Sequence, residues 1–233
     1  LLGNGKGEFL ESKASLPSEI LGPLRFYAAE LADLNADGLV DLIIGNSGDK
    51  TNSKSQSVVY WNSDGGFSDS RSYLLPNGYF GINNEHILDI KSADVDGDGR
   101  RDLVILSTQN SPFYDGWSIQ VLSNRPEGFI DITAKAFPQS TSYRGAPNES
   151  TNSPWIAFLK LVDLNGDGTV DILFDSIDNF KDKTPEKQAV FFLNDGFAHF
   201  IPVYAGDVLD LPANPNWYFS KASSHIQDFK ISW

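Results

Sequence analysis

Short apolar segments recur along the chain, and acidic clusters separate them. The segments FYAAELA, HILDIKSA and WIAFLKLV precede the three acidic clusters, and DLIIG, DLVIL and DILFD follow them. A third apolar segment (SVVYW, SIQVL or AVFFL) comes later in each case, before a glycine-containing turn and a fourth strand-like segment. β-Branched and aromatic residues bounded by glycine, aspartate and asparagine are typical of strands and tight turns. The pattern therefore predicts three copies of a four-stranded unit.

Repeated four-stranded units of this size are typical of the blades of a β-propeller. We therefore expect an all-β fold with three full blades and a partial blade at each end, in chain order 1–22, 23–84, 85–153, 154–223 and 224–233. A β-sandwich with coincidentally similar hairpins is the alternative, and the repetition argues against it. The two ends could pair to complete one composite blade. We favour a larger ring, since the chain begins with Leu1 rather than methionine and is expected to be processed or a fragment.

A nine-residue pattern, D-x-[DN]-x-D-G-x-x-D, occurs in each copy. It reads DLNADGLVD from Asp33, DVDGDGRRD from Asp94 and DLNGDGTVD from Asp163, with starts 61 and 69 residues apart. Carboxylates packed this closely repel each other unless a cation lies between them. Ca²⁺ takes about 6–8 oxygen ligands from carboxylates, amides, backbone carbonyls and water. The pattern therefore predicts one calcium loop in each blade, about three ions in all.

Alternate positions of each loop supply the predicted ligands, four through side chains and one through a backbone carbonyl. The first loop would use the side chains of Asp33, Asn35, Asp37 and Asp41 and the carbonyl of Leu39. The second would use Asp94, Asp96, Asp98 and Asp102 with the carbonyl of Arg100. The third would use Asp163, Asn165, Asp167 and Asp171 with the carbonyl of Thr169.

An EF-hand and a metal-free polar turn are the two competing interpretations of the loops. An EF-hand needs a bidentate glutamate at its twelfth position and flanking helices. Here the twelfth positions are Ile44, Ile105 and Phe174, inside strand-like segments, so an EF-hand is excluded. In a polar turn without metal, the aspartates would cap local backbone amides. The density of carboxylates favours a cation site over such turns.

The loop motif between two strands resembles the FG-GAP/VCBS repeats of bacterial surface proteins and of the integrin α-subunit propeller. The resemblance covers most of the chain. It implies that calcium binds at residues 33–41, 94–102 and 163–171, and that each loop joins the first and second strands of a blade. The chain departs from the pattern at Trp233, which stands where a next motif would have its first aspartate.

Composition narrows the possible partners. The chain has 31 acidic and 18 basic residues, a formal net charge of −13, and no basic stripe. No nucleic-acid partner is therefore expected. No apolar run is long enough to span a membrane, and cysteine is absent. Three bound Ca²⁺ ions would bring the net charge to about −7. Since extracellular calcium can fill loops of modest affinity, we expect an extracellular, cell-surface or periplasmic location.

The same repetition argues against catalysis by the acidic clusters, because an enzyme normally needs one unique site. No catalytic residue and no organic cofactor site is predicted, and whether the chain belongs to an enzyme stays open. His86 and His225 share one repeat position, which Arg25 and Trp155 fill elsewhere; a column this varied is expected to line the mouth of the ring.

Function is instead expected in the long loops at the opposite face of the ring. These loops cover residues 46–57, 71–85, 107–116, 133–154, 175–188 and 202–224. Their aromatics are Tyr79, Phe80, Phe113, Tyr114, Tyr143, Trp217 and Tyr218. Such side chains either bind a protein or glycan or pack the loops onto the ring. The main hypothesis is a calcium-stabilised adhesion or recognition scaffold. The alternative is an accessory or catalytic domain of a secreted carbohydrate-active enzyme.

Overall fold

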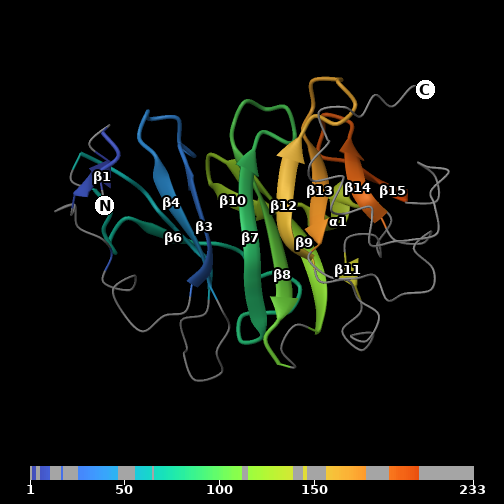
Figure 1. The fold of residues 1–233 in the computed structure, drawn as a ribbon, viewed down its shortest axis with the longest axis horizontal. Coiled ribbons are helices and arrows are strands. Elements are labelled where there is room, and N and C mark those ends of the chain that lie inside the picture. Colours follow the sequence, from blue (N-terminus) through green and yellow to red (C-terminus); the bar gives the residue numbers. More distant parts are fainter. Residues whose placement is uncertain are drawn as a thin grey trace.

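The computed structural model describes residues 2–3, 6–10, 17, 26–46, 56–64, 66–111, 115–138, 144–145, 156–176 and 189–204. In this part of the chain nearly all regular structure is β, with fifteen strands and one short helix. Three antiparallel sheets contain four consecutive strands each, and Figure 1 shows them side by side. The all-β prediction of four-stranded, propeller-like blades is confirmed.

The first sheet contains β3 (Phe26–Ala32), β4 (Asp41–Asn46), β5 (Val58–Tyr60) and β6 (Ser72–Leu74). The second contains β7 (Glu85–Ala93), β8 (Asp102–Gln109), β9 (Asp115–Arg125) and β10 (Gly128–Asp131). The third contains β12 (Ile156–Val162), β13 (Asp171–Ser176), β14 (Ala189–Asn194) and β15 (Phe200–Tyr204). The helix α1 (Thr133–Ala136) follows β10, and β11 (Arg144–Gly145) pairs with β9.

The middle sheet is buried on both faces, which explains why an uninterrupted apolar run, Leu103 to Leu106, follows the first residue of its second strand. Successive side chains of a strand point to opposite faces. In β8, Leu103 and Ile105 pack into the core shared with the first sheet, whereas Val104 and Leu106 pack into the core shared with the third. Every residue of β8 is buried. The sheets therefore stack face to face, as blades do.

The first strands of the three sheets lie close to one another. β7 contacts both β3 and β12, and the backbone N–H of Leu159 in β12 donates to Oδ2 of Asp89 in β7 at 2.9 Å. The approach is also tight between β4 and β7, where a Cβ atom added at Gly45 would lie 2.6 Å from Cγ2 of Ile87. This close stacking places the loop after β3 against the second sheet and the loop after β7 against the third.

The predicted partial blades lie only in part within the described residues. β1 (Leu2–Gly3) and β2 (Phe9–Leu10) form a two-stranded antiparallel sheet at the beginning of the chain. Residues 224–233, Trp233 included, lie outside the described residues, so the predicted first strand there, the blade boundaries and the number of blades stay predictions. Among the helices described, none has the length and apolar character needed to cross a membrane.

Candidate metal centre

Each acidic loop joins the first and second strands of a sheet. The first loop follows Ala32 at the end of β3, and its ninth residue, Asp41, is the first residue of β4. The second loop lies in the same way between β7 and β8, and the third between β12 and β13. The loops therefore occupy equivalent positions in the three sheets, at the ends of strands whose pairing holds both ends of each loop.

The first aspartate of each loop accepts hydrogen bonds from the loop backbone. In the second loop, Oδ1 of Asp94 accepts from the N–H groups of Gly97 (2.8 Å) and Asp98 (3.1 Å), and Oδ2 accepts from Gly99 (2.8 Å). Asp33 and Asp163 also accept hydrogen bonds from the backbone of their own loops. This aspartate therefore closes the turn around its own carboxylate.

Glycine at the sixth position has a structural reason in all three loops. Gly38, Gly99 and Gly168 have φ values of 87°, 86° and 87°, in the left-handed region that a side chain disfavours. The fourth position is also left-handed: Gly97 and Gly166 have φ values of 74° and 79°, whereas Ala36 takes the same conformation at 58°. The first loop therefore carries backbone strain that the other two do not.

The aspartate at the ninth position of each loop is completely buried. Asp41, Asp102 and Asp171 are each 0% exposed. In the second loop, Oδ2 of Asp102 accepts from the N–H of Val95 (3.0 Å) and Oδ1 from the N–H of Asn124 at the end of the third strand (2.8 Å). The same two bonds recur at Asp41 and Asp171. This side chain thus ties the loop to two strands of its sheet.

Burial raises the pKa of these ninth-position carboxyls. The pKa of Asp102 rises to about 6 because burial disfavours its charge; the N–H groups of Asn124 and Val95 oppose the rise, and Asp96 and Asp98 add to it. Burial likewise raises the pKa of Asp41 and of Asp171, again against two backbone hydrogen bonds. Each loop therefore contains a carboxylate whose negative charge a nearby cation would stabilise.

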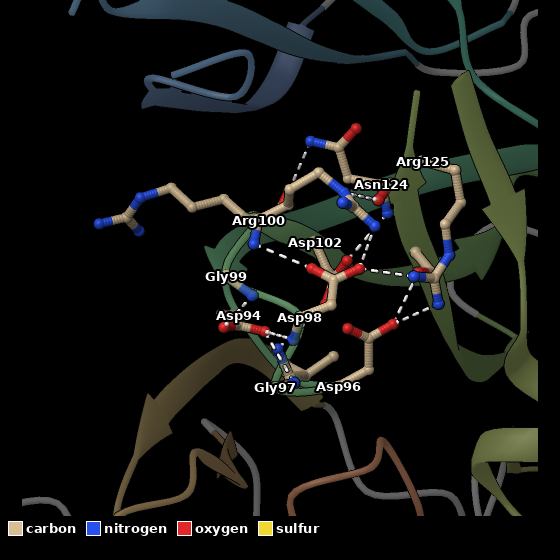
Figure 2. Close-up of polar contacts among 12 residues, drawn as sticks. Asp94, Asp96, Gly97, Asp98, Gly99, Arg100, Asp102, Asn124 and Arg125 are labelled. Atoms are coloured by element: carbon tan, nitrogen blue, oxygen red, sulfur yellow. Dashed lines mark hydrogen bonds and ion pairs between the residues drawn. The ribbon is translucent and has the colours of Figure 1, made fainter. Parts of the chain in front are cut away.

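Three carboxylates of the second loop converge on one point, as Figure 2 shows. Asp94, Asp96 and Asp102 each offer an oxygen atom, and these atoms all lie within 4.8 Å of one another. Oδ1 of Asp96 is buried and has no hydrogen-bond partner among the described residues. A buried carboxylate oxygen without a donor is costly unless a cation binds it. The residues present therefore fit a hard divalent cation.

Arginine side chains distinguish the second loop from the other two. Arg125 donates from Nη2 to Oδ2 of Asp96 (2.6 Å) and from Nη1 to Oδ2 of Asp98 (2.5 Å), and Arg100 also pairs with Asp98. In the first loop, Oδ2 of Asp37 instead accepts from the side-chain amide of Asn35 at 2.9 Å. The negative charge of the second loop is therefore partly neutralised by one arginine of the loop itself and one of β9.

The third loop resembles the first. Oδ2 of Asp167 accepts from the amide of Asn165 (2.7 Å), and Oδ1 accepts from the N–H (2.8 Å) and hydroxyl (2.6 Å) of Thr169. These hydrogen bonds, those from Thr169 first, lower the pKa of Asp167. In every loop, the aspartate at the fifth position accepts a hydrogen bond from the backbone N–H of the seventh residue, since Leu39 and Arg100 donate in the same way as Thr169. The ligand roles assigned to individual residues, including the carbonyls of the seventh residues, stay predictions.

Sequence reasoning missed one recurring residue of the site. Asn62, Asn124 and Asn194 follow the third strand-like segment of each repeat, and each donates its backbone N–H to the ninth aspartate of its own loop. A signal exists in the sequence, because asparagine occurs at this place in all three copies. It is easily overlooked, since these residues lie 21 to 23 positions beyond the aspartates they contact.

Several other predicted residues lie away from the loops. His86 is completely buried in β7, and burial lowers its pKa. Tyr79 is 47% exposed and packs edge-on against Phe80 with ring centroids 5.1 Å apart. The remaining predicted residues lie outside those that the structure describes: Arg25, Phe113, Tyr114, Tyr143, Trp155, Trp217, Tyr218 and His225.

Comparison with known families gives a match that follows the loops. The model of the FG-GAP-like repeat matches residues 33–105 and 94–174, so each match begins at the first aspartate of a loop and ends in the second strand of the next sheet. The chain belongs to the FG-GAP-like repeat family. Each FG-GAP-like match spans two acidic loops and the strands between them, and the two matches overlap at the second loop. No curated protein matches the chain significantly.

Proposed function

We propose that this FG-GAP-like chain is an extracellular, calcium-binding β-propeller domain that acts as a recognition scaffold. Ca²⁺ is structural in this proposal and occupies the loops at residues 33–41, 94–102 and 163–171. The long loops of the opposite face bind a protein or glycan ligand. The observation that carries the calcium assignment is the convergence of Asp94, Asp96 and Asp102 around a buried carboxylate oxygen that has no donor among the described residues.

Electrostatics supports a cation of charge 2+ in each loop. The loops gather carboxylates whose mutual repulsion contributes to the raised pKa of Asp41, Asp102 and Asp171. Oxygen is the only ligand atom that these loops offer, and all-oxygen sites of flexible geometry favour Ca²⁺ over softer metals. Asn35 and Asn165 replace Asp96 in the outer two loops, and an amide oxygen serves Ca²⁺ as well.

A structural role follows from what the loops connect. Each ninth aspartate already holds the loop to the second and third strands, and the first aspartate organises the turn. A cation between these side chains would stabilise the folded state without taking part in a reaction. The three loops are near copies, which favours a repeated structural element over a unique catalytic centre.

The extracellular assignment rests on the calcium supply. Loops of this kind on a surface bind calcium modestly, in the range that extracellular concentrations saturate. A cell-surface or periplasmic location would serve equally. The net charge of −13 supports the same environment, because a high concentration of divalent cations reduces self-repulsion.

The recognition role rests on the long connections at the face opposite the acidic loops. Tyr79, in the described loop between the first two blades, is partly exposed beside Phe80, and an exposed ring of this kind can stack on a sugar or anchor a protein. Most of the other long connections lie outside the described residues. The alternative that the chain serves a secreted carbohydrate-active enzyme therefore stays a prediction.

Calorimetric titration of the metal-depleted chain with calcium, combined with thermal unfolding, tests the structural role. We expect about three bound ions and a melting temperature that rises by several degrees with calcium and falls with a chelator. Glu127→Gln is the control, because it removes one exposed acidic charge outside the loops. A melting curve that neither calcium nor the chelator moves would contradict the proposal.

A glycan array and a panel of extracellular proteins, both probed with calcium present, test the recognition role. We expect binding that is lost when Tyr79 is replaced by alanine if this loop belongs to the ligand face. Tyr73→Phe, within β6, is the matched aromatic control. Absence of binding to every glycan and every protein would contradict the recognition role and leave the calcium assignment untouched.

A further inference from the structure

The asparagine that follows each third strand-like segment holds the acidic loop of its own sheet. Its side-chain amide donates to the carbonyl of the eighth loop residue: Asn62 to Val40 (2.8 Å), Asn124 to Arg101 (3.1 Å) and Asn194 to Val170 (3.0 Å). The backbone N–H of the same asparagine donates to the aspartate at the ninth loop position. Each asparagine therefore binds two consecutive residues of its own loop.

Two of these asparagines also reach the loop of the preceding sheet. Nδ2 of Asn124 donates to the carbonyl oxygen of Leu34 at 2.7 Å, and Nδ2 of Asn194 donates to that of Val95 at 2.9 Å. The acceptors lie 90 and 99 residues earlier in the chain. The N–H of Ala198 also donates to the carbonyl of Val95, at 2.9 Å. The next sheet therefore contacts the backbone of each of these loops directly.

The residue contacted is the second of its loop, and it is held from three directions. The N–H of Leu34 donates to its own Asp41, and its carbonyl accepts from Asn124 in the next sheet. Its side chain is 3% exposed and lies in the core between the two sheets. Val95 repeats this arrangement with Asp102 and Asn194, and its side chain is 1% exposed in the next core.

This contact bears on the predicted cation ligands through the planarity of the peptide group. The carbonyl of Leu34 belongs to the peptide that also contains the N atom of Asn35, and the carbonyl of Val95 to the peptide of Asp96. Because the peptide group is rigid, fixing its oxygen fixes the backbone from which the third-position ligand projects. The asparagine of one sheet therefore orients a predicted ligand of the sheet before it.

We propose that Asn124 and Asn194 are positioning residues that couple cation binding in one blade to docking of the next blade. Cation binding in the first loop favours the backbone position that Asn124 recognises, and docking of the second sheet favours the position that the cation requires. Coupling of this kind is reciprocal, so calcium in the first loop strengthens the interface between the first two sheets by the same factor. Asn194 couples the second loop to the third sheet in the same way. The inference rests on the calcium binding proposed above.

Hydrogen–deuterium exchange with mass spectrometry tests the coupling, because it reports on each loop separately. The whole 233-residue chain is titrated with calcium, and the calcium concentration for half-maximal protection is read for peptides covering 33–41, 94–102 and 163–171. In Asn124→Ala, we expect this concentration to rise about fivefold for residues 33–41, the effect of one net hydrogen bond. The half-maximal calcium concentration should also rise for the second loop, because the hydrogen bond to the carbonyl of Arg101 is lost, and it should stay unchanged for the third loop.

Asn194→Ala provides an independent test at the other interface. It should raise the half-maximal calcium concentration for residues 94–102 and 163–171 and leave that of residues 33–41 unchanged. Asn62→Ala is the matched control, since among the described residues its side-chain N–H group donates only to its own loop, at Val40, and its Oδ1 accepts only from the adjacent Ser63. It should raise the half-maximal calcium concentration for residues 33–41 alone. Protection of β4 and β13 without calcium shows that each variant is folded.

The outcomes separate the two proposals. In one outcome, calcium protects all three loops of the unmodified chain, but Asn124→Ala raises the half-maximal calcium concentration only for residues 94–102 and Asn194→Ala only for 163–171. The asparagines then act within their own blades, so the coupling is overturned while calcium binding stands. If calcium protects no loop of the unmodified chain, the calcium proposal fails and the coupling fails with it. A shift in the preceding loop for both variants establishes the coupling.

Discussion

The side-chain amide of Asn124 lies 2.7 Å from the carbonyl oxygen of Leu34, a residue of the acidic loop in the preceding sheet. The same amide also binds the loop of its own sheet, at the carbonyl of Arg101. An acidic loop after the first strand of a blade is thus part of two structures, the turn between two strands and the interface between two blades. Substitutions in the loops should therefore affect interfaces as well as turns.

Glycine at the fourth loop position allows the interface contribution to be measured. Gly97→Ala and Gly166→Ala introduce the same strain, because both residues have a left-handed φ. A Cβ atom at Gly97 would lie 2.9 Å from the carbonyl oxygen of Gly196, in the turn between β14 and β15, whereas one at Gly166 would meet nothing within 4 Å among the described residues. Each variant should lose about 1–2 kcal/mol of unfolding free energy to strain, and Gly97→Ala should lose more. Urea denaturation compares the two, and equal losses would contradict an interface contact at this position.

Ala36 is expected to be a destabilising residue of the first loop. It is an exposed alanine with φ of 58°, at the position that glycine fills in the second and third loops. Ala36→Gly should raise the unfolding free energy by about 1 kcal/mol, because the left-handed conformation carries no Cβ penalty in glycine. Ala29→Gly in β3 is the matched control, also exposed but in a strand, and it should lower stability by about 0.5–1 kcal/mol. A loss in both variants would contradict strain at Ala36.

Asp102→Asn should destabilise the chain even when a chelator removes all calcium. Both carboxylate oxygens accept buried backbone N–H groups, and asparagine can replace only one of these acceptors. The amide group would leave one buried N–H without a partner, at a cost of about 1–3 kcal/mol. Urea denaturation in the presence of a chelator measures this loss. Glu127→Gln is the control, and an unchanged midpoint in Asp102→Asn would show that the two hydrogen bonds are not needed.

Glu85 should make the chain less stable as the pH rises. Burial raises the pKa of Glu85 above its ordinary value of 4.5, although hydrogen bonds from Ser107 and from the N–H of Gly78 oppose the rise. Between the ordinary and the raised pKa the folded chain binds more protons than the unfolded chain, so stability decreases as pH increases. We expect Glu85→Gln to remove this contribution and flatten the dependence of melting temperature on pH above about 4.5.

Measurement of Glu85→Gln and the unmodified chain in the same buffers separates this effect from the loops. The raised pKa values of Asp41, Asp102 and Asp171 act in the same direction without calcium and are common to both proteins. Parallel pH profiles for the two proteins would contradict an ionisation of Glu85 linked to folding.

The sequence predicted most of the regular structure, because the determining pattern is local and repeated. The segment FYAAELA is β3 itself, and the expected second strands begin at Asp41, Asp102 and Asp171 as observed. Strand alternation, turn-forming glycine and alternating oxygen side chains all act within about ten residues. The carboxylates of Asp94, Asp96 and Asp102 were expected to come together for the same reason.

Several contacts of the site could not be predicted in this way. The pairing of Arg125 with Asp96 and Asp98 spans 29 and 27 residues and depends on where β9 lies beside β8. Leu34 and Val95 are buried between sheets, and nothing in the loop motif itself specifies an apolar residue at the second position. Most of the long loops, on which the expected ligand face depends, lie outside the described residues.

The sequence by itself determined the repeat, the order of the strands and the oxygen-bearing side chains at alternate positions of each loop, since these depend on neighbours along the chain. Only the tertiary structure decided that Asn124 and Asn194 join one loop to the next. Those hydrogen bonds form between residues 90 and 99 positions apart, after the sheets have stacked and brought a third strand beside the loop of the sheet before it.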